Sequence, residues 1–292
     1  MGKLLQLDHV HMQFGGLVAV NDLSFSLNKG MITALIGPNG AGKTTVFNCI
    51  TGFYKPSSGR IAMFTGEANE HELDLLMRSP RQHTQDIYLL ERMAGDEIVK
   101  KARIARTFQN IRLFPALTVL ENLLLGQHSE LLEASGWFGG IFGGHAFHKA
   151  EHEATERAKF WLNEIGLTQR ANDIASSLPY GDQRRLEIAR AMCTQPLLLC
   201  LDEPAAGLNN RESSELNAML LKIRKQHDVS IFLIEHDMSV VMEISDHIIV
   251  LDYGVKIADG APEQIRKDPK VIAAYLGVED EEVGITIAEV AV

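Results

Sequence analysis

Gly37-Pro38-Asn39-Gly40-Ala41-Gly42-Lys43-Thr44 is the stretch of this 292-residue chain that decides its fold. The apolar run Met31–Ile36 precedes it, and helix-like sequence continues to Thr51. A buried strand, a glycine-rich loop and a helix in this order form the context in which the pattern G-x-x-x-x-G-K-[ST] binds phosphate. Glycines let successive backbone N–H groups turn toward phosphate oxygens, and the helix adds the positive end of its dipole. We therefore expect a nucleotide site here.

The polar residues of this loop have distinct expected roles. Lys43 reaches the β- and γ-phosphates, the Thr44 hydroxyl coordinates Mg²⁺, and Thr45 contacts the α-phosphate. Backbone groups hold the remaining phosphate oxygens. The residues predicted to bind the nucleotide are Asn39, Gly40, Ala41, Gly42, Lys43, Thr44 and Thr45.

Two adjacent carboxylates follow a second apolar strand, Leu197–Leu201. Ligands of open α/β sheets bind at the carboxyl ends of strands, where Asp202 and Glu203 stand. Asp202 can hold Mg²⁺, and Glu203 can accept a proton from an attacking water, a step worth about 10²–10⁴ in rate. His236 follows the strand-like run Ser230–Ile234 and is a candidate contact for the γ-phosphate.

Composition excludes several classes of protein. Hydrophobic residues make up 46% and charged residues 23% of the chain, which are values of a globular protein. Lys plus Arg number 28 against 38 Asp plus Glu, and the net charge of −10 argues against a nucleic-acid partner. No apolar run reaches the length of a membrane span and no signal-peptide core is present, so we expect a cytoplasmic protein. Cys49, Cys193 and Cys200 lie in apolar segments without metal-binding spacing, which favours three reduced core thiols.

Strand-like and helix-like segments alternate along the chain, which predicts an α/β layer with a mainly parallel sheet. Leu4–Phe14 and Leu23–Leu27 have half-buried strand patterns, and Asn28–Gly30 is typical of a hairpin turn. Gly66–Lys101 has little periodicity and is interpreted as a surface insertion with some helix. Further strands are expected over 60–64, 197–201, 230–234 and 247–251, and helices over 43–51, 117–127, 147–165, 181–194, 211–226 and 238–244.

The acidic excess is concentrated at the C-terminus. We expect one domain over residues 1–277 and an acidic, disordered tail over 278–292. This tail carries −5 of the net charge and has no Lys or Arg, so the rest of the chain also carries −5. Its acidic residues are Glu279, Asp280, Glu281, Glu282 and Glu289.

Taken together, these motifs resemble those of the ATP-binding cassette (ABC) ATPases over about Leu4–Gly277. The resemblance implies an α/β P-loop NTPase fold with a RecA-like core, an antiparallel β-subdomain and a helical subdomain at about 110–185. The further motifs that carry it are the Q-loop Thr107-Phe108-Gln109, the signature segment Leu178–Arg185, the D-loop Ala206–Asn209 and the switch-histidine loop Ile234–Asp237.

The family resemblance implies an enzyme that hydrolyses ATP with Mg²⁺. Glu203 would act as the base, Gln109 and His236 would sense the γ-phosphate, and Phe14 would stack on adenine. The implied Mg²⁺ ligands are Thr44, Gln109 and Asp202. Two cassettes of this family pair head to tail, so that each signature motif faces the ATP of the other subunit. The signature residues here are Leu178, Pro179, Tyr180, Gly181 and Asp182.

Local sequence narrows the resemblance to the larger ATPase subunit of bacterial branched-chain amino acid importers. It rests on stretches such as Phe14–Leu17, Thr51–Pro56, Asp202–Asn209 and Gly260–Ile265. The implied function is to energise uptake of branched-chain, hydrophobic amino acids from the inner face of the cell membrane. The implied partners are a second, different ATPase subunit, two membrane permeases and, through them, a periplasmic binding protein. Importers of urea, amides or other amino acids use similar cassettes, and a non-transport ABC ATPase is a further alternative.

The signature segment departs from the usual Leu-Ser-Gly-Gly-Gln of the family. Pro179 offers neither a hydroxyl nor an N–H to phosphate, Tyr180 replaces a glycine, and Asp182 opposes an incoming anion. Asn209 replaces the usual aspartate of the D-loop. The hypothesis is a weakened signature for the partner's nucleotide beside a competent site with Glu203, so that the two sites are unequal. A non-catalytic regulatory subunit is the alternative.

Three segments leave two interpretations open. Gly66–Lys101 is either a contact or regulatory surface or a tolerated loop. The glycine-aromatic stretch Gly136–Gly144 either touches permease or lipid or caps the helical subdomain. His145, His148 and His152 have a spacing that suggests Zn²⁺, but no cysteine or bracketing motif accompanies them.

Overall fold

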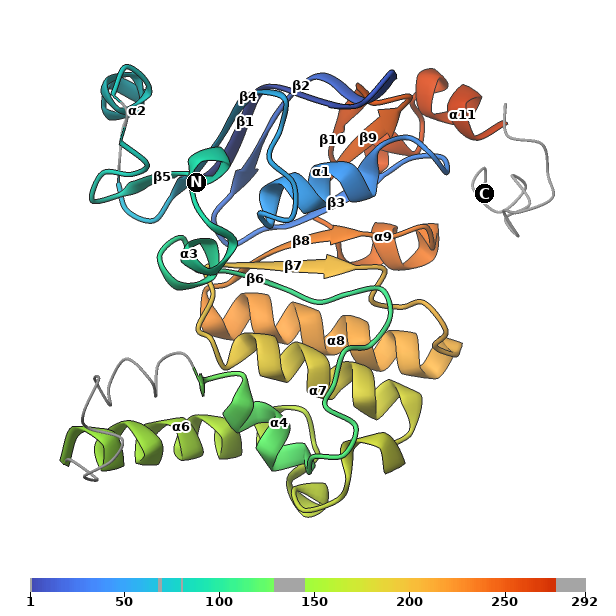
Figure 1. The fold of residues 1–292 in the computed structure, drawn as a ribbon. Coiled ribbons are helices and arrows are strands. Elements are labelled where there is room, and N and C mark those ends of the chain that lie inside the picture. Colours follow the sequence, from blue (N-terminus) through green and yellow to red (C-terminus); the bar gives the residue numbers. More distant parts are fainter. Residues whose placement is uncertain (1, 68–69, 80, 129–144, 277–292) are drawn as a thin grey trace.

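The structure of the chain, a computed structural model, describes residues 2–67, 70–79, 81–128 and 145–276 (Figure 1). In this part of the chain, two sheets are stacked with one helix between them. An antiparallel sheet has the order β2-β1-β4-β5, and a mainly parallel sheet has the order β10-β9-β3-β8-β7-β6. The antiparallel sheet consists of β1 (Lys3–Phe14), β2 (Leu17–Asn28), β4 (Ser58–Phe64) and β5 (Ile87–Leu89).

The mainly parallel sheet contains the strands that lead into the expected motifs. Strands β6, β7, β8, β3 and β9 run parallel, and β10 is an antiparallel edge strand on β9. Its strands are β3 (Ile32–Ile36), β6 (Ile104–Arg106), β7 (Leu198–Asp202), β8 (Ser230–Ile234), β9 (His247–Asp252) and β10 (Val255–Gly260).

Helices cover both faces of the parallel sheet (Figure 1). The described helices are α1 (Lys43–Ile50), α2 (Glu70–Met77), α3 (Gly95–Lys100), α4 (Val119–Leu125), α6 (His145–Glu164), α7 (Tyr180–Met192), α8 (Asn210–His227), α9 (Met238–Ile244), α10 (Pro262–Ile265) and α11 (Pro269–Leu276). Within the described ranges, no helix combines the length and the hydropathy that a membrane crossing requires.

The central strands are buried on both faces because alternate side chains enter different cores. All five residues of β3, β7 and β8 are buried. Leu35 packs with α1 and the antiparallel sheet, whereas Ala34 and Ile36 pack with α7, α8 and α9. Helix α1 therefore lies between the two sheets, and α7 lies on the opposite face of the parallel sheet.

The element order agrees with the expected P-loop α/β fold. Strand β8 and helix α9 have the predicted bounds, and most other predicted strands and helices agree to within two residues. The short strands β5 and β6 and the partly exposed β10 were not predicted, because three residues or an irregular burial pattern give no clear period. Cys49, Cys193 and Cys200 are buried and free, as expected.

The prediction of a hairpin at Asn28–Gly30 is wrong. Strand β2 ends at Asn28 in the antiparallel sheet, and β3 pairs with β8 and β9 in the other sheet. A strand that is buried on both faces needs a neighbour on each edge, which β2 alone cannot provide. The Gly30 N–H donates to the Ser230 hydroxyl at 2.8 Å and fixes the crossing between the sheets.

The interpretation of Gly66–Lys101 as a surface insertion is wrong for its second half. Ile87 and Leu89 are fully buried in β5, which pairs with β4. Leu90 and Ile98 join the core beneath α1. These apolar residues lie in elements of three to six residues, too short for a period to appear in the sequence.

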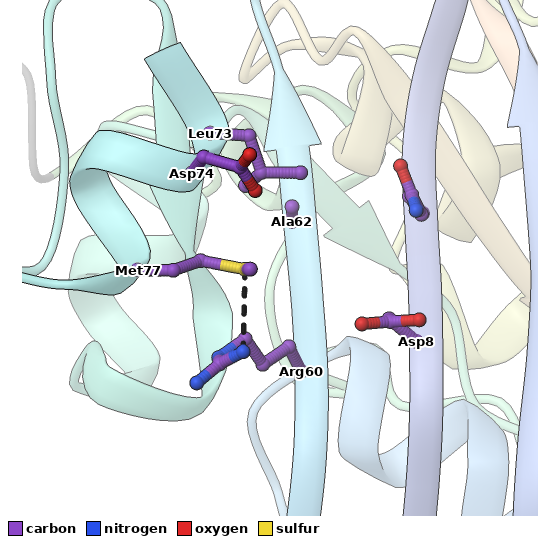
Figure 2. Close-up of a pocket in the computed structure, with 7 residues that line it drawn as sticks. Asp8, Arg60, Ala62, Leu73, Asp74 and Met77 are labelled. Atoms are coloured by element: carbon purple, nitrogen blue, oxygen red, sulfur yellow. Dashed lines mark hydrogen bonds between the residues drawn. The ribbon is translucent and has the colours of Figure 1, made fainter. Parts of the chain in front are cut away.

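The first half of this segment forms one wall of a surface cavity of about 230 Å³ (Figure 2). The cavity lies between α2 and the strands β1 and β4, and the Arg60 guanidinium reaches across to the Met77 sulfur at 3.3 Å. Its lining residues are Gln6, Asp8, Arg60, Ala62, Leu73, Asp74 and Met77. The expected nucleotide residues do not line it, so this cavity is separate from the site described next.

Candidate nucleotide site

The phosphate loop joins β3 to α1 in a conformation that only glycine adopts at two positions. Gly37 has φ 146° and Gly42 has φ 96°. A Cβ atom would lie 2.0 Å from the Leu251 carbonyl oxygen at Gly37 and 2.4 Å from the Ala19 carbonyl oxygen at Gly42. Gly42 caps α1, and this fully described helix has no acidic side chain in its first turn. The loop therefore presents a helix N-terminus suited to an anion.

Lys43 is folded onto this loop. Its side chain is buried, and Nζ donates to the carbonyl oxygens of Gly37 at 2.6 Å and Pro38 at 2.9 Å. Burial lowers the pKa of Lys43, and the nearby charge of Glu203 raises it. Asn39, Gly40 and Thr44 are exposed, Thr45 is half-buried, and the Ala41 side chain is buried. The loop thus holds a cation against its own carbonyl groups while its exposed residues face outward.

The two predicted carboxylates stand at the end of β7. Asp202 is the last residue of the strand and is 8% exposed, and its burial raises its pKa while the Arg106 charge lowers it. Glu203 has a positive φ of 45°, and its N–H donates to the Ile234 carbonyl oxygen at 2.9 Å. This hydrogen bond ties Glu203 to the end of the neighbouring strand β8.

Two predicted residues from separate stretches of sequence, Gln109 and His236, meet at the Glu203 carboxylate. The Gln109 amide donates from Nε2 to Glu203 Oε2 at 2.7 Å, and His236 Nδ1 lies 3.6 Å from the same oxygen. The Glu203 side chain is 23% exposed and His236 is 64% exposed. A partly exposed carboxylate held by an amide at a strand end can take a proton from a water molecule.

Glu235 belongs to this arrangement but was not predicted from the sequence. It is 1% exposed, and burial raises its pKa. Oε1 accepts the Ala205 N–H at 2.8 Å, and Oε2 accepts the His236 N–H at 3.2 Å. The side chain therefore joins the loop after Glu203 to the loop that carries His236. An acidic residue directly after an apolar strand was the available signal.

Arg106 is a second residue that sequence analysis missed. Its guanidinium donates to the Asn48 side chain at 3.0 Å and to the Thr51 hydroxyl at 2.9 Å, both at the end of α1. It also lies over the Phe108 ring, 4.4 Å from the centroid, and its charge lowers the pKa of Asp202. Arg106 thus links α1, β7 and the Q-loop, and a cation inside an otherwise apolar strand was the signal for it.

The predicted adenine contact, Phe14, is 41% exposed at the end of β1. Its ring packs edge-to-face against Tyr54, with the centroids 5.2 Å apart. Tyr54 follows α1, and its N–H donates to the Asn48 carbonyl oxygen at 3.1 Å. An exposed ring whose orientation is set by a neighbouring ring is suited to stacking on a base.

The signature residues surround the N-terminus of α7. Pro179 caps the helix with an extended backbone, and Tyr180 is its first residue. A Cβ atom on Gly207, which has φ 79°, would lie 3.3 Å from the Tyr180 ring, so the tyrosine packs on the D-loop. The Asn209 side chain accepts the N–H groups of Arg211 and Glu212 and caps α8. Pro179 and Asn209 therefore cap helices, and Tyr180 packs on the D-loop, so the residues that depart from the usual motifs have structural roles here.

That Asp182 opposes an incoming phosphate stays a prediction, but its carboxylate does not stand alone in the structure. Asp182 pairs closely with Arg185, and its second oxygen lies 3.3 Å from Arg170. Only 16% of its side chain is exposed. Both cations also pair with a second acid, Arg170 with Asp173 at 2.9 Å and Arg185 with Glu215 at 3.9 Å, so Asp182 belongs to a network of opposite charges. A cavity of about 270 Å³ opens here, lined by Pro179, Gly181, Asp182, Arg185, Leu208, Arg211, Glu212, Glu215 and Leu216.

The structure does not bring the signature residues to the phosphate loop of the same chain. Helices α1 and α7 pack on opposite faces of the parallel sheet. This separation agrees with the head-to-tail pairing that the family resemblance implies.

Several expectations fall outside or at the edge of the described residues. Gly136–Gly144 and the tail 278–292 lie outside them. Among the residues that are described, no three His, Cys, Asp or Glu side chains gather in a metal-binding group. His148 lies 3.6 Å from Glu151, on its own helix. The side chain of His145 lies outside the described ones, so the zinc alternative for His145, His148 and His152 stays a hypothesis.

Comparison with known families and proteins agrees with these features. Residues 20–206 match the family described as ABC transporter, and residues 255–281 match the family described as branched-chain amino acid ATP-binding cassette transporter. The chain is 50% identical over 274 residues to the high-affinity branched-chain amino acid transport ATP-binding protein LivG of Escherichia coli, covering 94% of this chain and 98% of LivG. The corresponding protein BraF of Pseudomonas aeruginosa is 47% identical with the same coverage.

Solved structures with this fold are ATP-binding cassettes. A cassette of an ABC transporter in its ADP conformation has a TM-score of 0.75 and 29% identity, covering 95% of this chain and all of that chain. A nucleotide-free cassette has a TM-score of 0.74 and 29% identity, covering 94% of this chain and 99% of that chain.

Proposed function

We propose that this chain, which belongs to the ABC transporter family, is the ATP-binding and ATP-hydrolysing subunit of an importer for branched-chain amino acids. The observation that carries the catalytic part is the meeting of Gln109 and His236 at the Glu203 carboxylate, beside Lys43 and the phosphate loop. The substrate class rests on the relatives LivG and BraF and on the match of residues 255–281.

ATP binding is assigned to the phosphate loop and its flanking residues. Lys43 exchanges its contacts with the Gly37 and Pro38 carbonyl oxygens for the β- and γ-phosphates. The backbone N–H groups of Asn39–Gly42 and the hydroxyl of Thr45 hold further phosphate oxygens. Phe14 stacks on the adenine, oriented by its contact with Tyr54.

The chain offers the oxygen donors that Mg²⁺ prefers. The exposed Thr44 hydroxyl, the Asp202 carboxylate and the Gln109 amide oxygen lie at the same edge of the parallel sheet. Bound Mg²⁺ neutralises charge on the β- and γ-phosphates. The Arg106 charge favours the ionised form of Asp202 against the effect of burial.

Hydrolysis follows from the position of Glu203. Its carboxylate accepts a proton from the water that attacks the γ-phosphate, while Gln109 fixes the carboxylate by donating to Oε2. His236, held by Glu235 through its backbone N–H, contacts the γ-phosphate and senses its presence. Most of the rate enhancement comes from positioning and charge compensation.

The partners are assigned by the same reasoning. The signature end of α7 lies on the opposite face of the parallel sheet from α1, which supports pairing with a second ATPase subunit whose ATP it contacts. The second subunit is a different chain, and the pair binds two membrane permeases that a periplasmic binding protein supplies. The chain then works on the inner face of the cell membrane, bound to these permeases.

The test is reconstitution of the chain with its second ATPase and two permeases in proteoliposomes that contain ATP and Mg²⁺. We expect uptake of leucine, isoleucine and valine that requires ATP and the binding protein. The matched control is the same assembly without ATP. ATP hydrolysis without uptake of any of the three amino acids, combined with uptake of urea or an amide, would contradict the substrate assignment.

A further inference from the structure

Helix α7 carries a fully buried arginine that contacts the Q-loop. Arg184 is 0% exposed, and its Nη1 donates to the Phe108 carbonyl oxygen at 2.7 Å. Its Nη2 donates to the Gln109 carbonyl oxygen at 2.5 Å. The guanidinium therefore holds two successive carbonyl groups of the Q-loop backbone in the fork geometry that arginine provides.

The contact extends along one face of α7. Glu187 accepts from Arg184 at 2.9 Å through Oε2 and from the Arg112 N–H at 2.9 Å through Oε1. Arg190 donates to the Arg112 carbonyl oxygen. Because residues three apart share a helix face, these three side chains form a continuous strip that grips the backbone from 108 to 112. We call this strip, Arg184, Glu187 and Arg190, the α7 clamp.

The α7 clamp is more polar than packing alone requires. Burial raises the pKa of Glu187, and Arg184 Nε has no hydrogen-bond partner among the described residues. A buried ion pair with an unsatisfied donor contributes little net stability compared with apolar side chains of similar size. Its position between two functional segments therefore points to a role in coupling.

The α7 clamp lies between the signature residues and the contact of Gln109 with Glu203. The Gln109 backbone is held by Arg184, and the Gln109 side chain holds Glu203 at 2.7 Å. Arg184 is itself two residues beyond Asp182, the last signature residue, on the same hydrogen-bonded helix. A displacement of the N-terminus of α7 is thus passed to the Gln109–Glu203 contact.

We propose that Arg184 is a positioning residue through which the partner's ATP, bound at the signature end of α7, sets the Gln109–Glu203 contact in this chain's own site. The inference rests on the proposed function, because the signature end has this role only in a pair of ATPase subunits. It adds a physical route by which occupancy of one site controls hydrolysis at the other.

The test uses Arg184→Lys in the reconstituted transporter. Lysine keeps the charge but cannot bind both carbonyl groups in a fork. We expect kcat for ATP hydrolysis to fall about 10-fold, within the usual range of coupling between sites, while the KM for ATP changes less than about 3-fold. Arg224→Lys is the matched control, because Arg224 pairs with Asp246 at 2.8 Å outside the site. This control is expected to leave both constants unchanged.

A double-mutant cycle separates positioning from a general loss of stability. If Arg184 acts through Gln109, the Gln109→Ala, Arg184→Lys double variant hydrolyses ATP within about 2-fold of Gln109→Ala alone. Losses that multiply, or an unchanged kcat in Arg184→Lys, would overturn the inference. If Arg184→Lys does not assemble, Glu187→Gln is measured in the same cycle with the same expectations. Absence of ATP hydrolysis in the unmodified transporter would instead contradict the proposed function.

Discussion

The N-termini of α1 and α7 are both proposed to contact a nucleotide phosphate, but they differ in the side chains that surround them. Helix α1 has glycine at its cap and no acidic residue in its first turn, and Lys43 Nζ donates to carbonyl oxygens of the preceding phosphate loop. Helix α7 has Pro179 at its cap and Asp182 in its first turn, compensated by Arg170 and Arg185. Under the proposed function, the first end binds phosphate through its own backbone, and the second binds the partner's phosphate beside a balance of side-chain charges. We infer that the first tolerates few substitutions, and that the second can be tuned.

The largest expected effect concerns this chain's own nucleotide site, which includes the N-terminus of α1 and Glu203. Glu203→Gln keeps the size of the side chain but removes the proton acceptor, so ATP turnover by the reconstituted transporter should fall about 10²–10⁴-fold. ATP binding by this variant, measured by equilibrium dialysis, should persist. Unchanged turnover would mean that this chain's site does not hydrolyse ATP, which favours the regulatory alternative.

A smaller effect is expected on the α7 side. Arg185→Ala leaves Asp182 with Arg170 alone, so the affinity of the partner's site for ATP should fall about 3–10-fold. The measurement is the ATP concentration that gives half-maximal hydrolysis.

The control for this variant is Arg185→Ala combined with Asp182→Ala. If charge balance is the cause, the double variant should recover most of the lost affinity. If the affinity stays low in the double variant, Arg185 itself contacts phosphate and the balance of charges is not the explanation.

The smallest effect concerns support of the phosphate loop. The Gly254 N–H, in the β9–β10 turn, donates to the Ala41 carbonyl oxygen at 3.0 Å. Strand β10 is held to β9 by Asp259, which pairs with His247 at 2.7 Å and Lys256 at 2.6 Å. The hydrogen bond from His247 is the main cause that lowers the pKa of Asp259 from 3.8 to about 2. Asp259→Asn should therefore lower the free energy of unfolding by about 1–2 kcal/mol at pH 7.

The contribution of Asp259 to the free energy of unfolding should depend on pH in a defined direction. Because the folded pKa is lower than the unfolded one, the contribution of Asp259 is fully present above pH 3.8 and is lost as the pH falls through about 2. Urea unfolding of both proteins should show the full difference at pH 7 and only a small part of it near pH 2. An equal difference at both values would show that the ionised form of Asp259 is not what stabilises β10.

The sequence could predict those parts of the site that occupy short, ordered motifs. Gly37–Lys43 needs a fixed order of residues on one turn, and Asp202–Glu203 directly follows a buried strand, so both carry their context in the sequence. The contact between Gln109 and Glu203 joins residues 94 positions apart, and only the paired strands β6 and β7 bring them together.

Compensation of charge was harder to predict than position. Asp182 suggested repulsion because the sequence does not show that Arg185, three residues along the helix, and Arg170, 12 residues earlier, both turn toward its carboxylate. The buried roles of Arg184 and Glu235 were also missed, because polar residues in a helix or after a strand are usually exposed. Their burial depends on the packing of segments that are distant in the chain.

The central claim is that the two helix ends serve two different ATP molecules, and Lys43→Ala tests it most directly. Equilibrium dialysis of the assembled transporter at saturating ATP should give two ATP molecules for the unmodified protein. Lys43→Ala removes a buried charged contact and should weaken this chain's own site about 100-fold or more, which leaves one ATP, on the partner. Two bound ATP molecules in the variant would contradict the assignment of the phosphate loop. If the variant bound no ATP at all, the claim that the N-terminus of α7 contacts a second ATP, held by the partner, would be contradicted.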